Sequence, residues 1–438
     1  MSRRASPDAA RRGWCPGLAR PMPTGDGLLA RIHPPLGVLA LAQAQAVAEG
    51  ARRYGNGHLD LTARANLQIR GVSEATTAPL SALLTAAGLG DTRTDGGPQR
   101  LTLTGPLADD TLRTLTRAIE AAGRSISGLP AKTLVAVGFA LDEADVSVVP
   151  VAEGLVAIGL ATAAEAVGVY PLPDAPAVVA LILTAFAATG RRRMRDLTAD
   201  ELRAILPPRH CEQSEAIQGS GSSPNGALLI GFAPLAMTAI GPAPGFSSIG
   251  GIAILTLDAP FGRCTADAFA RLIAVAEDIG AAEFRLTPSR GLVLVPTRLG
   301  RAEAHLPALA EDFITGAGDP RRAVAACTGA PACASGTTQT LVDAARLAEA
   351  FRPLATRGLS AHVSGCAKGC AKPGPADMTL VGRDGEYAII IGGAPGDPPS
   401  LQLPIETALE RLGKAATIGL AAAFRPEAID GGRNRRPA

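Results

Sequence analysis

Four of the seven cysteines in this 438-residue chain lie between residues 327 and 370. They form two pairs, Cys327-x5-Cys333 and Cys366-x3-Cys370, each in a short segment rich in Gly, Ala and Ser. Four soft thiolates on two loops can enclose a four-iron, four-sulfur (4Fe-4S) cluster, with one thiolate on each iron. Glycine lets the backbone approach the cluster sulfides closely, and four are present here: Gly329, Gly336, Gly365 and Gly369. The spacing therefore predicts a cluster on these cysteines.

Structural zinc is the main competing interpretation of the same cysteines. A spacing of three residues between ligands is allowed for zinc, but five is wide, and paired C-x2-C knuckles are absent. Two disulfides are the third interpretation, disfavoured in a reducing compartment. The cluster is the preferred prediction, with zinc and disulfides left open.

Composition excludes several other classes of function. The chain has 42 Lys and Arg against 40 Asp and Glu, so its net charge of +2 gives no general attraction to nucleic acid or anionic membrane. One Trp and three Tyr disfavour base-stacking platforms. No run of about 18 apolar residues is present, and the basic start MSRRASPDAARRGW lacks the apolar core of a signal peptide. We expect a cytoplasmic protein that binds neither nucleic acid nor membrane.

An internal repeat predicts the architecture. At one constant offset, without a gap, GLLARIHPPLG (27–37) lies over IAILTLDAPFG (252–262) and LDLTARANLQIRG (59–71) lies over FRLTPSRGLVLVP (284–296). Each copy reads as a strand, an Ala-rich helix and a strand pair, which is an α+β unit. A longer α/β stretch follows each copy, at 96–190 and 320–425. We therefore predict two pseudo-symmetric halves.

The two halves are joined by a polar segment, PPRHCEQSEAIQGSGSSPNG (207–226). It follows a predicted helix with a capping box, Thr198-x-x-Glu201, and has no hydrophobic periodicity. We interpret it as an inserted surface loop, and its RHCEQSEAIQ stretch is similar to translated interspersed repeats. His210 and Cys211 are therefore excluded from the site.

The C-x5-C and C-x3-C pattern resembles the cluster motif of the nitrite and sulfite reductase family, in which a siroheme lies against the cluster. That resemblance implies two halves, each a ferredoxin-like α+β unit plus a larger α/β unit. The implied boundaries are 15–90 and 240–312 for the ferredoxin-like units, 95–200 for the α/β unit without a cluster, 207–226 for the insert and 318–425 for the cluster-binding unit. At the repeat offset, the positions that face the four cysteines are Thr102, Ala108, Leu141 and Asp145, so the first half is expected to hold no cluster.

Nearly the whole chain is similar to one branch of that family, the precorrin-3B synthases. The marks are RRGWCPGLARPMPTGDGLL at the start, LTARANLQIRG in the first repeat, and HVSGCAKGCAKPGPADMTLVGRDG at the cluster motif. This resemblance implies an oxygen-dependent monooxygenase of cobalamin biosynthesis. Its substrates would be precorrin-3A and dioxygen, and its products a meso-hydroxylated macrocycle with a ring-A acetate lactone. It also implies a mononuclear non-haem iron beside the cluster and an NADH-linked electron donor protein.

A tetrapyrrole fringed with carboxylates needs a ring of cations. Arg64 and Arg70 alternate with Asn66 and Gln68 on one face of a predicted strand, and Arg binds carboxylates in a bidentate fashion. The resemblance puts Arg64, in the Thr-x-Arg motif, in the tetrapyrrole pocket. It adds Arg100 and Lys132 as basic groups, although sulfite reductases carry a second lysine where this chain has Leu134.

Other candidates are weaker. Arg285 and Arg290 occupy the strand pair of the second repeat, but Arg64 aligns with Ser289. Cys15, Cys264 and His362 are interpreted as structural residues. The open alternatives are a siroheme-dependent nitrite or sulfite reductase and an iron-sulfur electron carrier or redox sensor. No GxGxxG element follows a predicted strand, so we expect no nicotinamide-binding dinucleotide fold.

Overall fold

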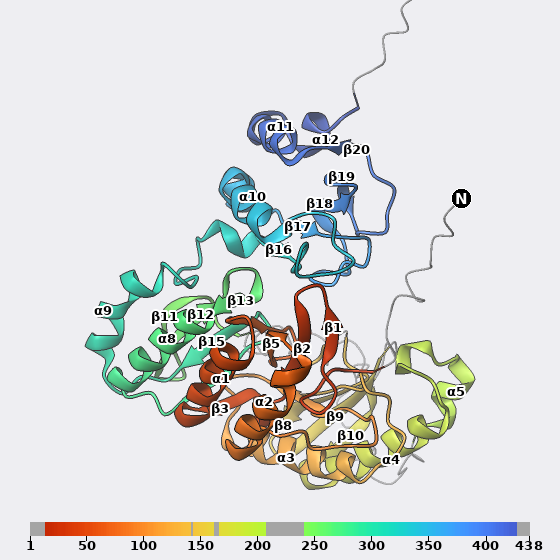
Figure 1. Ribbon diagram of the computed structural model, residues 1–438. Helices are drawn as coiled ribbons and strands as arrows, with labels where there is room; N and C mark the ends of the chain where they lie inside the picture. Colours follow the sequence, from red (N-terminus) through yellow and green to blue (C-terminus); the bar gives the residue numbers. More distant parts are fainter. Residues whose placement is uncertain (1–13, 142, 162–165, 207–240, 427–438) are drawn as a thin grey trace, which may run out of the picture. The chain divides into compact units, whose positions relative to one another are not determined.

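The computed structural model describes residues 14–141, 143–161, 166–206 and 241–426. The chain forms two compact units, each mixing helices with β-sheet (Figure 1). The first unit extends to Ala317 and leaves out Thr24–Asp26, which belong with Gly318 onward to the second. The predicted α+β class is confirmed. The predicted insert at 207–226 lies outside the described residues.

The first unit contains both copies of the repeat. The first copy comprises β1 (Met22–Thr24), β2 (Gly27–Ile32), β3 (Val38–Ala40), α1 (Leu41–Tyr54), β4 (His58–Leu61), β5 (Leu67–Val72) and α2 (Glu74–Ala86). The second comprises β11 (Gly245–Ile249), β12 (Ile252–Asp258), β13 (Arg263–Thr265), α8 (Ala266–Asp278), β14 (Glu283–Leu286), β15 (Gly291–Leu294) and α9 (Leu299–Leu309). Most elements recur at the predicted offset, since β12, β13, α8, β14 and α9 begin at the positions that match the starts of β2, β3, α1, β4 and α2. The repeat is therefore confirmed.

The repeat extends to backbone conformation, and one helix of each copy has a side-chain cap. Leu36 and Phe261, which occupy equivalent positions in the two copies, both have positive φ, at 57° and 55°. The side chain of Ser73 accepts a hydrogen bond from the third residue of α2, and Thr265 does the same for α8. These caps satisfy backbone N–H groups that have no partner inside the helix. Helices α2 and α8 therefore start where the sequence supplies a hydroxyl.

The two copies exchange their short third strands. One sheet has the order β1-β2-β5-β4-β13 and the other has the order β11-β12-β15-β14-β3, so β3 and β13 each pair with the other copy. Helices α1 and α8 also pack together. The sequence did not predict this exchange, because alternation reports which residues form strands but not which strands pair.

The larger α/β stretch of the first unit forms a third sheet. It comprises β6 (Thr102–Thr104), α3 (Asp110–Arg124), β7 (Val135–Val137), β8 (Val146–Ala152), β9 (Leu155–Leu160), β10 (Ala166–Pro171) and α4 (Ala175–Ala188). The strands follow in chain order, with parallel β6-β7-β8 and antiparallel β8-β9-β10. Helix α5 (Ala199–Ala204) comes next, and the predicted Thr198 and Glu201 capping box is confirmed.

The second unit repeats this topology. Its elements are β16 (Val324–Ala326), α10 (Thr340–Ala355), β17 (Ala361–Ser364), β18 (Ala376–Arg383), β19 (Glu386–Gly393), β20 (Leu401–Leu403), α11 (Ile405–Ile418) and α12 (Leu420–Ala423). Strands β16-β17-β18 are parallel and β18-β19-β20 antiparallel, as in the first unit. The same fold therefore occurs twice, with different loops.

The offset between the two repeat copies does not hold inside these α/β sheets. Strands β6 and β16 end at residues 104 and 326, whereas β7 and β17 end at residues 137 and 364. Thr102 therefore lies inside β6, while Cys327 follows β16, and the predicted pairing of Thr102 and Asp145 with cysteine positions is wrong in register. The equivalent loops of the first half, GPLAD (105–109) and GFALDEAD (138–145), nevertheless contain no cysteine.

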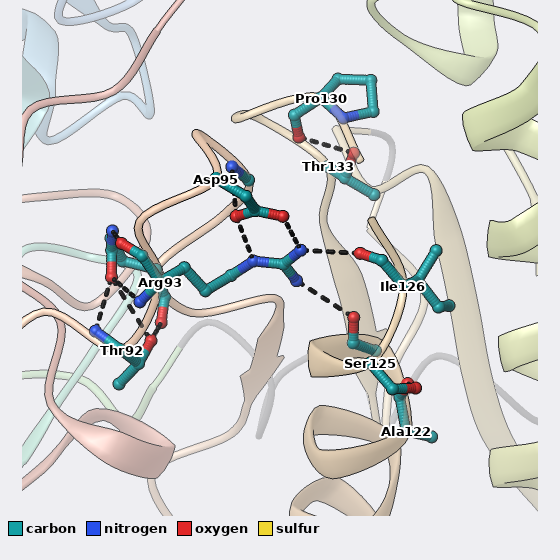
Figure 2. Close-up of polar contacts among 11 residues, drawn as sticks. Thr92, Arg93, Asp95, Ala122, Ser125, Ile126, Pro130 and Thr133 are labelled. Atoms are coloured by element: carbon teal, nitrogen blue, oxygen red, sulfur yellow. Dashed lines mark hydrogen bonds and ion pairs between the residues drawn. The ribbon is translucent and has the colours of Figure 1, made fainter. Parts of the chain in front are cut away.

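The segment between α2 and β6, which leads to Arg100, is braced by Arg93. Its guanidinium binds both carboxylate oxygens of Asp95, at 2.9 and 2.5 Å, and donates to the Ile126 carbonyl at 2.6 Å (Figure 2). The hydrogen bond from Arg93 lowers the pKa of Asp95 to about 2. This brace ties the segment to the end of α3 and fixes the approach to Arg100.

None of the helices in the described part of the chain has both the length and the apolar character needed to span a bilayer.

Candidate functional site

The four predicted cluster cysteines lie in two loops of the second unit. Cys327 directly follows β16, and Cys333 lies further along the same loop, before α10. Cys366 and Cys370 lie in the loop between β17 and β18. Because β16 and β17 are parallel neighbours, their carboxyl ends lie at one edge of the sheet. The fold therefore brings both cysteine pairs to the same edge.

The four thiols lie within electrostatic reach of one another. Burial raises the pKa of the Cys370 thiol, and negative charge on the other three cysteines raises it further. Burial also raises the pKa of Cys366, with smaller contributions in the same direction from Cys333 and Cys327. Thiolates gathered in this way repel one another unless bound cations compensate their charge. The arrangement therefore favours metal over four free thiolates.

Hydrogen bonds orient Cys327 and its loop. The backbone N–H of Gly365 donates to Cys327 Sγ at 3.1 Å, and the Thr340 hydroxyl donates to the Cys327 carbonyl at 2.5 Å. The N–H of Cys333 donates to the Gly329 carbonyl at 2.7 Å. An N–H directed at a cysteine sulfur is one of the contacts by which a protein tunes the potential of an iron-sulfur cluster. The loop thus presents an oriented thiol.

The glycines of the motif have a role that the sequence did not predict. A Cβ on Gly365 would lie 3.1 Å from the Gly329 Cα and 3.2 Å from the Gly336 Cα, so the two cysteine loops are in backbone contact. Gly369 has a positive φ of 59°, and a Cβ there would lie 2.7 Å from the ring of Pro395. Larger residues would force the loops apart. Close approach of these glycines to cluster sulfides stays a prediction.

A buried hydrogen bond supports the start of α10 behind this loop. The Tyr387 hydroxyl, on β19, donates to the Asp343 carboxylate on α10 at 2.6 Å. Burial is the largest cause that raises the pKa of Tyr387, and the bond to Asp343 adds to it. Tyr387 therefore stays protonated and keeps donating, which holds β19 against the helix that follows the first cysteine pair.

Four thiols on two loops form the donor set of an iron-sulfur cluster, and these residues fit one. In the part of the chain that the structure describes, no three His, Cys, Asp or Glu side chains come together as ligands of a single metal ion. The thiolates of a 4Fe-4S cluster bind different irons and are spaced accordingly. The described residues thus offer no ligand set for the predicted mononuclear iron.

The predicted tetrapyrrole-binding residues lie in the first unit, near the turn between β4 and β5. The prediction that one strand carries all of them is wrong for Arg64 and Asn66, which lie in the turn after β4. The Thr62 hydroxyl oxygen accepts hydrogen bonds from the N–H groups of both residues, at 3.3 and 3.2 Å. Thr62, within the repeated segment LDLTARANLQIRG, therefore caps a turn rather than lying in a continuous strand.

Arg64 is half-buried and directed at a neighbouring turn. One guanidinium nitrogen donates to the Lys132 carbonyl at 3.1 Å. Burial lowers the pKa of Arg64, and the nearby cation Arg193 lowers it further. No carboxylate among the described residues forms an ion pair with Arg64. This cation is therefore available to an anionic ligand.

Arg100 is buried and donates its guanidinium hydrogen bonds to backbone carbonyls. It contacts the Pro34 carbonyl at 2.8 Å, the Ala65 carbonyl at 3.0 Å and the carbonyl of Arg64. Burial lowers the pKa of Arg100 to about 10. These contacts join the loop after β2 to the turn that carries Arg64. Arg100 thus holds the Arg64 turn in place, and its contact with the substrate stays a prediction.

Arg70 is buried in an ion-pair network rather than in a cluster with Arg64. Its side chain is 3.4 Å from the Asp60 carboxylate, which Arg263 also binds with two hydrogen bonds, at 2.6 and 3.0 Å. Arg263 lies on β13, the strand contributed by the second repeat. The network therefore ties the exchanged strand to its host sheet, and a contact of Arg70 with the substrate stays a prediction.

Gln68 and Asn66 are both buried at or next to the turn between β4 and β5. Gln68 lies opposite Arg31 in the pairing of β2 with β5, and with its amide reversed its oxygen accepts two hydrogen bonds from Arg31, at 2.9 and 2.7 Å. The Asn66 Oδ1 is buried and accepts no hydrogen bond from any described residue. A buried acceptor without a donor costs free energy unless a ligand or water supplies one.

Sequence reasoning missed Arg31 and His33. Burial lowers the pKa of His33 well below its ordinary value, and Arg31, Arg100 and Arg64 lower it further. Both residues belong to the polar pattern Arg31-x-His33 at the end of the largely apolar segment GLLARIH. Polar residues at a spacing of two near the end of a buried strand were the signal that was available.

Known proteins resemble this chain along most of its length. A family model for the nitrite/sulfite reductase ferredoxin-like half domain matches residues 20–87, which is the first copy of the repeat. Precorrin-3B synthase from a Sinorhizobium species is 32% identical, over 92% of this chain and 88% of that protein. The chain belongs to the precorrin-3B synthase family.

Other relatives of this precorrin-3B synthase family member are reductases. Ferredoxin–nitrite reductase from Synechococcus elongatus is 26% identical, over 87% of this chain and 83% of that protein. The solved structure of Mycobacterium tuberculosis NirA is 20% identical and covers 92% of this chain and 82% of its own, with a TM-score of 0.62. NirA shows the shared fold. The chain is therefore an oxidoreductase-type enzyme of this two-half architecture.

The remaining predicted residues in this precorrin-3B synthase family member lie in several places. Lys132 is in the turn before β7, and its carbonyl accepts from Arg64. Leu134, which replaces the second lysine of the sulfite reductases, is only 2% exposed. Arg285 pairs with Glu283 at 2.8 Å, and Arg290 lies in the second-repeat turn with a φ of 65°. Of the two weaker arginine candidates, Arg285 is thus in an ion pair and Arg290 in a turn.

Three further residues were interpreted as structural. Burial raises the pKa of Cys264 to about 12, and this thiol lies in the core of the first unit. His362 is fully buried within β17. Cys15 is only partly buried, and its side chain forms a hydrogen bond with Arg31. His210 and Cys211 lie outside the described residues.

Proposed function

We propose that this chain is a precorrin-3B synthase that uses dioxygen to hydroxylate precorrin-3A at a meso carbon. In the same reaction a ring-A acetate closes to a lactone. The observation that carries the proposal is the 32% identity to a precorrin-3B synthase over 92% of this chain. The four cysteines of the second unit support a redox enzyme. The cations Arg64 and Arg100 of the first unit support a polyanionic substrate.

The proposed reaction needs electrons from outside the chain. One oxygen atom of dioxygen enters the macrocycle and the other leaves as water, which consumes two electrons and two protons. We propose an NADH-linked donor protein as their source, because the sequence has no GxGxxG element after a predicted strand. A cytoplasmic location agrees with such a donor.

We propose that Cys327, Cys333, Cys366 and Cys370 hold a 4Fe-4S cluster, which when bound supplies electrons one at a time. The protein's own contribution is to hold these thiols at one sheet edge. The Gly365 N–H oriented at Cys327 Sγ, 3.1 Å away, and the backbone contact between the two loops serve that purpose.

For substrate binding we propose Arg64 as the principal carboxylate ligand, helped by Lys132. Asn66 and Gln68 would supply polar contacts, and the unsatisfied Asn66 Oδ1 can accept an N–H or O–H from the ligand. Arg100 and Arg70 contribute by positioning: Arg100 holds the Arg64 turn, and Arg70 holds the strand exchange. A guanidinium is suited to this work because its planar fork matches a carboxylate.

A siroheme-dependent nitrite or sulfite reductase is the second candidate. The 26% identity to a nitrite reductase over 87% of this chain favours it. Against it, Leu134 is buried where the sulfite reductases have a lysine, which removes a cation from an inorganic-anion site. The two candidates differ in the pigment that they bind and in their need for oxygen.

The first experiment is to purify the protein anaerobically, record its visible spectrum and test an acid-acetone extract for a tetrapyrrole. We expect a broad iron-sulfur shoulder without extractable siroheme, and conversion of precorrin-3A only when dioxygen is present. Extractable siroheme together with anaerobic turnover of nitrite or sulfite would instead establish the reductase.

Replacing Arg64 by Gln tests the substrate site. We expect binding of a tetrapyrrole carboxylate to weaken by roughly one to two orders of magnitude, because a charge-assisted pair is lost. The iron content should not change. Arg271→Gln is the matched control, since Arg271 is exposed in the same unit and pairs with Asp312 at 2.6 Å. An unchanged affinity in Arg64→Gln would remove Arg64 from the site.

A further inference from the structure

Lys368 lies at the centre of the second cysteine loop, two residues after Cys366 and two before Cys370. Its ammonium donates a hydrogen bond to the Ser335 hydroxyl oxygen at 3.1 Å. Ser335 belongs to the other cysteine loop, where it follows Cys333 by two residues. The Lys368 side chain therefore spans from one cysteine loop to the other, and its positive charge lies between them.

The two cysteine loops carry few charges apart from their thiols. Residues 327–339 contain no charged side chain, and residues 365–375 contain only Lys368 and Lys372. Neither loop therefore has a carboxylate of its own that could neutralise Lys368. Four thiolates bring four negative charges to these loops, and each electron that a cluster accepts adds one more. A cation here stabilises the state with the additional negative charge.

The two lysines of the second loop act on different groups. Burial raises the pKa of Cys366 and of Cys370, and the charge of Lys368 works in the opposite direction on both thiols. A hydrogen bond from the Lys368 backbone also lowers the pKa of Cys366. A backbone hydrogen bond lowers the pKa of Asp377 most, and the charge of Lys372 adds to that shift. Lys368 is therefore the lysine that faces the thiols.

We propose that the ammonium of Lys368 raises the reduction potential of a cluster held by the four cysteines, and so favours electron uptake from the donor. This inference rests on the proposed function and concerns the electron uptake that it requires. Reduction by an external donor adds one electron and neither forms nor breaks a bond. A cation between the loops stabilises the added negative charge, which makes that reduction more favourable. The hydrogen bond to Ser335 keeps the ammonium in this place.

Two other roles for Lys368 lead to different results. If Lys368 only held the two loops together, removal of the Ser335 hydroxyl should change the reduction potential as much as removal of the charge. If Lys368 only contacted the donor protein, the potential measured with small-molecule reductants should not change when the lysine is replaced. The proposed role requires that the potential follow the charge at residue 368.

The test uses full-length, cluster-loaded protein, titrated with dithionite and redox mediators and followed by visible absorption and electron paramagnetic resonance. We expect Lys368→Met to disfavour the reduced form by roughly tenfold, which is about 59 mV toward more negative potential for a one-electron couple. Lys372→Met is the matched control, because it removes the same charge from the same loop and should leave the potential close to that of the wild type. Ser335→Ala and Lys368→Arg should also do so, since both retain the cation.

The outcomes separate this inference from the proposed function. An unchanged potential in Lys368→Met, or an equal shift in Ser335→Ala or Lys372→Met, overturns the role of the Lys368 charge and leaves the cluster site intact. A wild-type protein that holds no iron and sulfide overturns both the cluster and the inference. If Lys368→Met holds no cluster, two other variants decide: a wild-type potential in both Lys368→Arg and Ser335→Ala supports the role of the charge, and a shift in either refutes it.

Discussion

In the first α/β sheet, the loop between β7 and β8 ends on a buried carboxylate, whereas the loop between β17 and β18 carries Cys366 and Cys370. The Asp145 side chain accepts hydrogen bonds from the N–H groups of Leu134 and Met194, both at 3.0 Å. It also pairs with Arg193 at 3.2 Å. The first loop is thus closed by contacts within the protein, and the second presents thiols.

The loop after the first strand differs in the same way. Residues 105–109 join β6 to α3 directly, whereas residues 327–339 join β16 to α10 and hold Cys327 and Cys333. The two sheets have the same strand order and the same parallel and antiparallel pairs. The comparison teaches that the sheet specifies where loops gather, and that loop length and residue type decide whether the edge binds metal.

The largest effect should come from Cys370→Ser. A serine hydroxyl is a poor ligand for iron in a cluster, so the variant should lose most of its iron and all measurable turnover. Iron and sulfide assays and the visible spectrum check this. Cys211→Ser is the control expected from the sequence to keep both. Iron loss from Cys211→Ser alone would show that the segment 207–226 is not a passenger.

A change at Asp145, in the first α/β sheet, should lower stability and leave the iron content unchanged. Asp145→Ala leaves Arg193 and two N–H groups without their acceptor, so we expect a loss of about 3–5 kcal/mol in the free energy of unfolding. Iron per folded molecule should stay normal. Denaturant unfolding followed by circular dichroism measures the loss. Asp267→Ala, which removes an exposed pair with Arg52, should cost at most about 1 kcal/mol.

Gly365→Ala tests the contact between the two cysteine loops. The added methyl would lie 3.1 Å from Gly329 Cα, so the loops must separate, at a cost of about 1–3 kcal/mol. We expect a partial loss of cluster iron and a shifted reduction potential. Gly374→Ala is the matched control, because a Cβ there meets no atom within 4 Å. Equal iron content in both variants would contradict the proposed role of the glycine contact.

The smallest effect concerns the contribution of His33 to the pH dependence of the free energy of unfolding. Because the pKa of His33 is lowered in the folded protein, the unfolded chain binds its proton first as pH falls. Stability should therefore decrease below about pH 6.5, by at most about 1.4 kcal/mol per pH unit from this residue. Above that pH the contribution is constant. His33→Gln should flatten the profile measured between pH 5 and pH 7, and an identical profile would contradict a neutral His33.

The candidate cluster cysteines and the repeat could be predicted because each is encoded in short segments of the sequence. Four thiols in two Gly-rich segments, and landmarks that recur at one constant offset, do not depend on what the rest of the chain does. Arg64 was likewise predicted from a motif. The contacts of Arg100 with backbone carbonyls and of Arg70 with Asp60 could not be predicted in this way, because a guanidinium that binds a ligand and one that binds the protein look alike in sequence.

The sequence by itself determined the identity of the candidate metal ligands, the two-fold architecture and the absence of cysteine from the matching loops of the first half. Only the tertiary structure decided that β3 and β13 change places, that Arg100 holds the Arg64 turn, and that His33 lies among cations. The physical reason is the distance along the chain over which each property is determined. Ligand type and hydrophobic period are properties of short segments, whereas the partner of a buried charge is set by which distant segments the fold brings together.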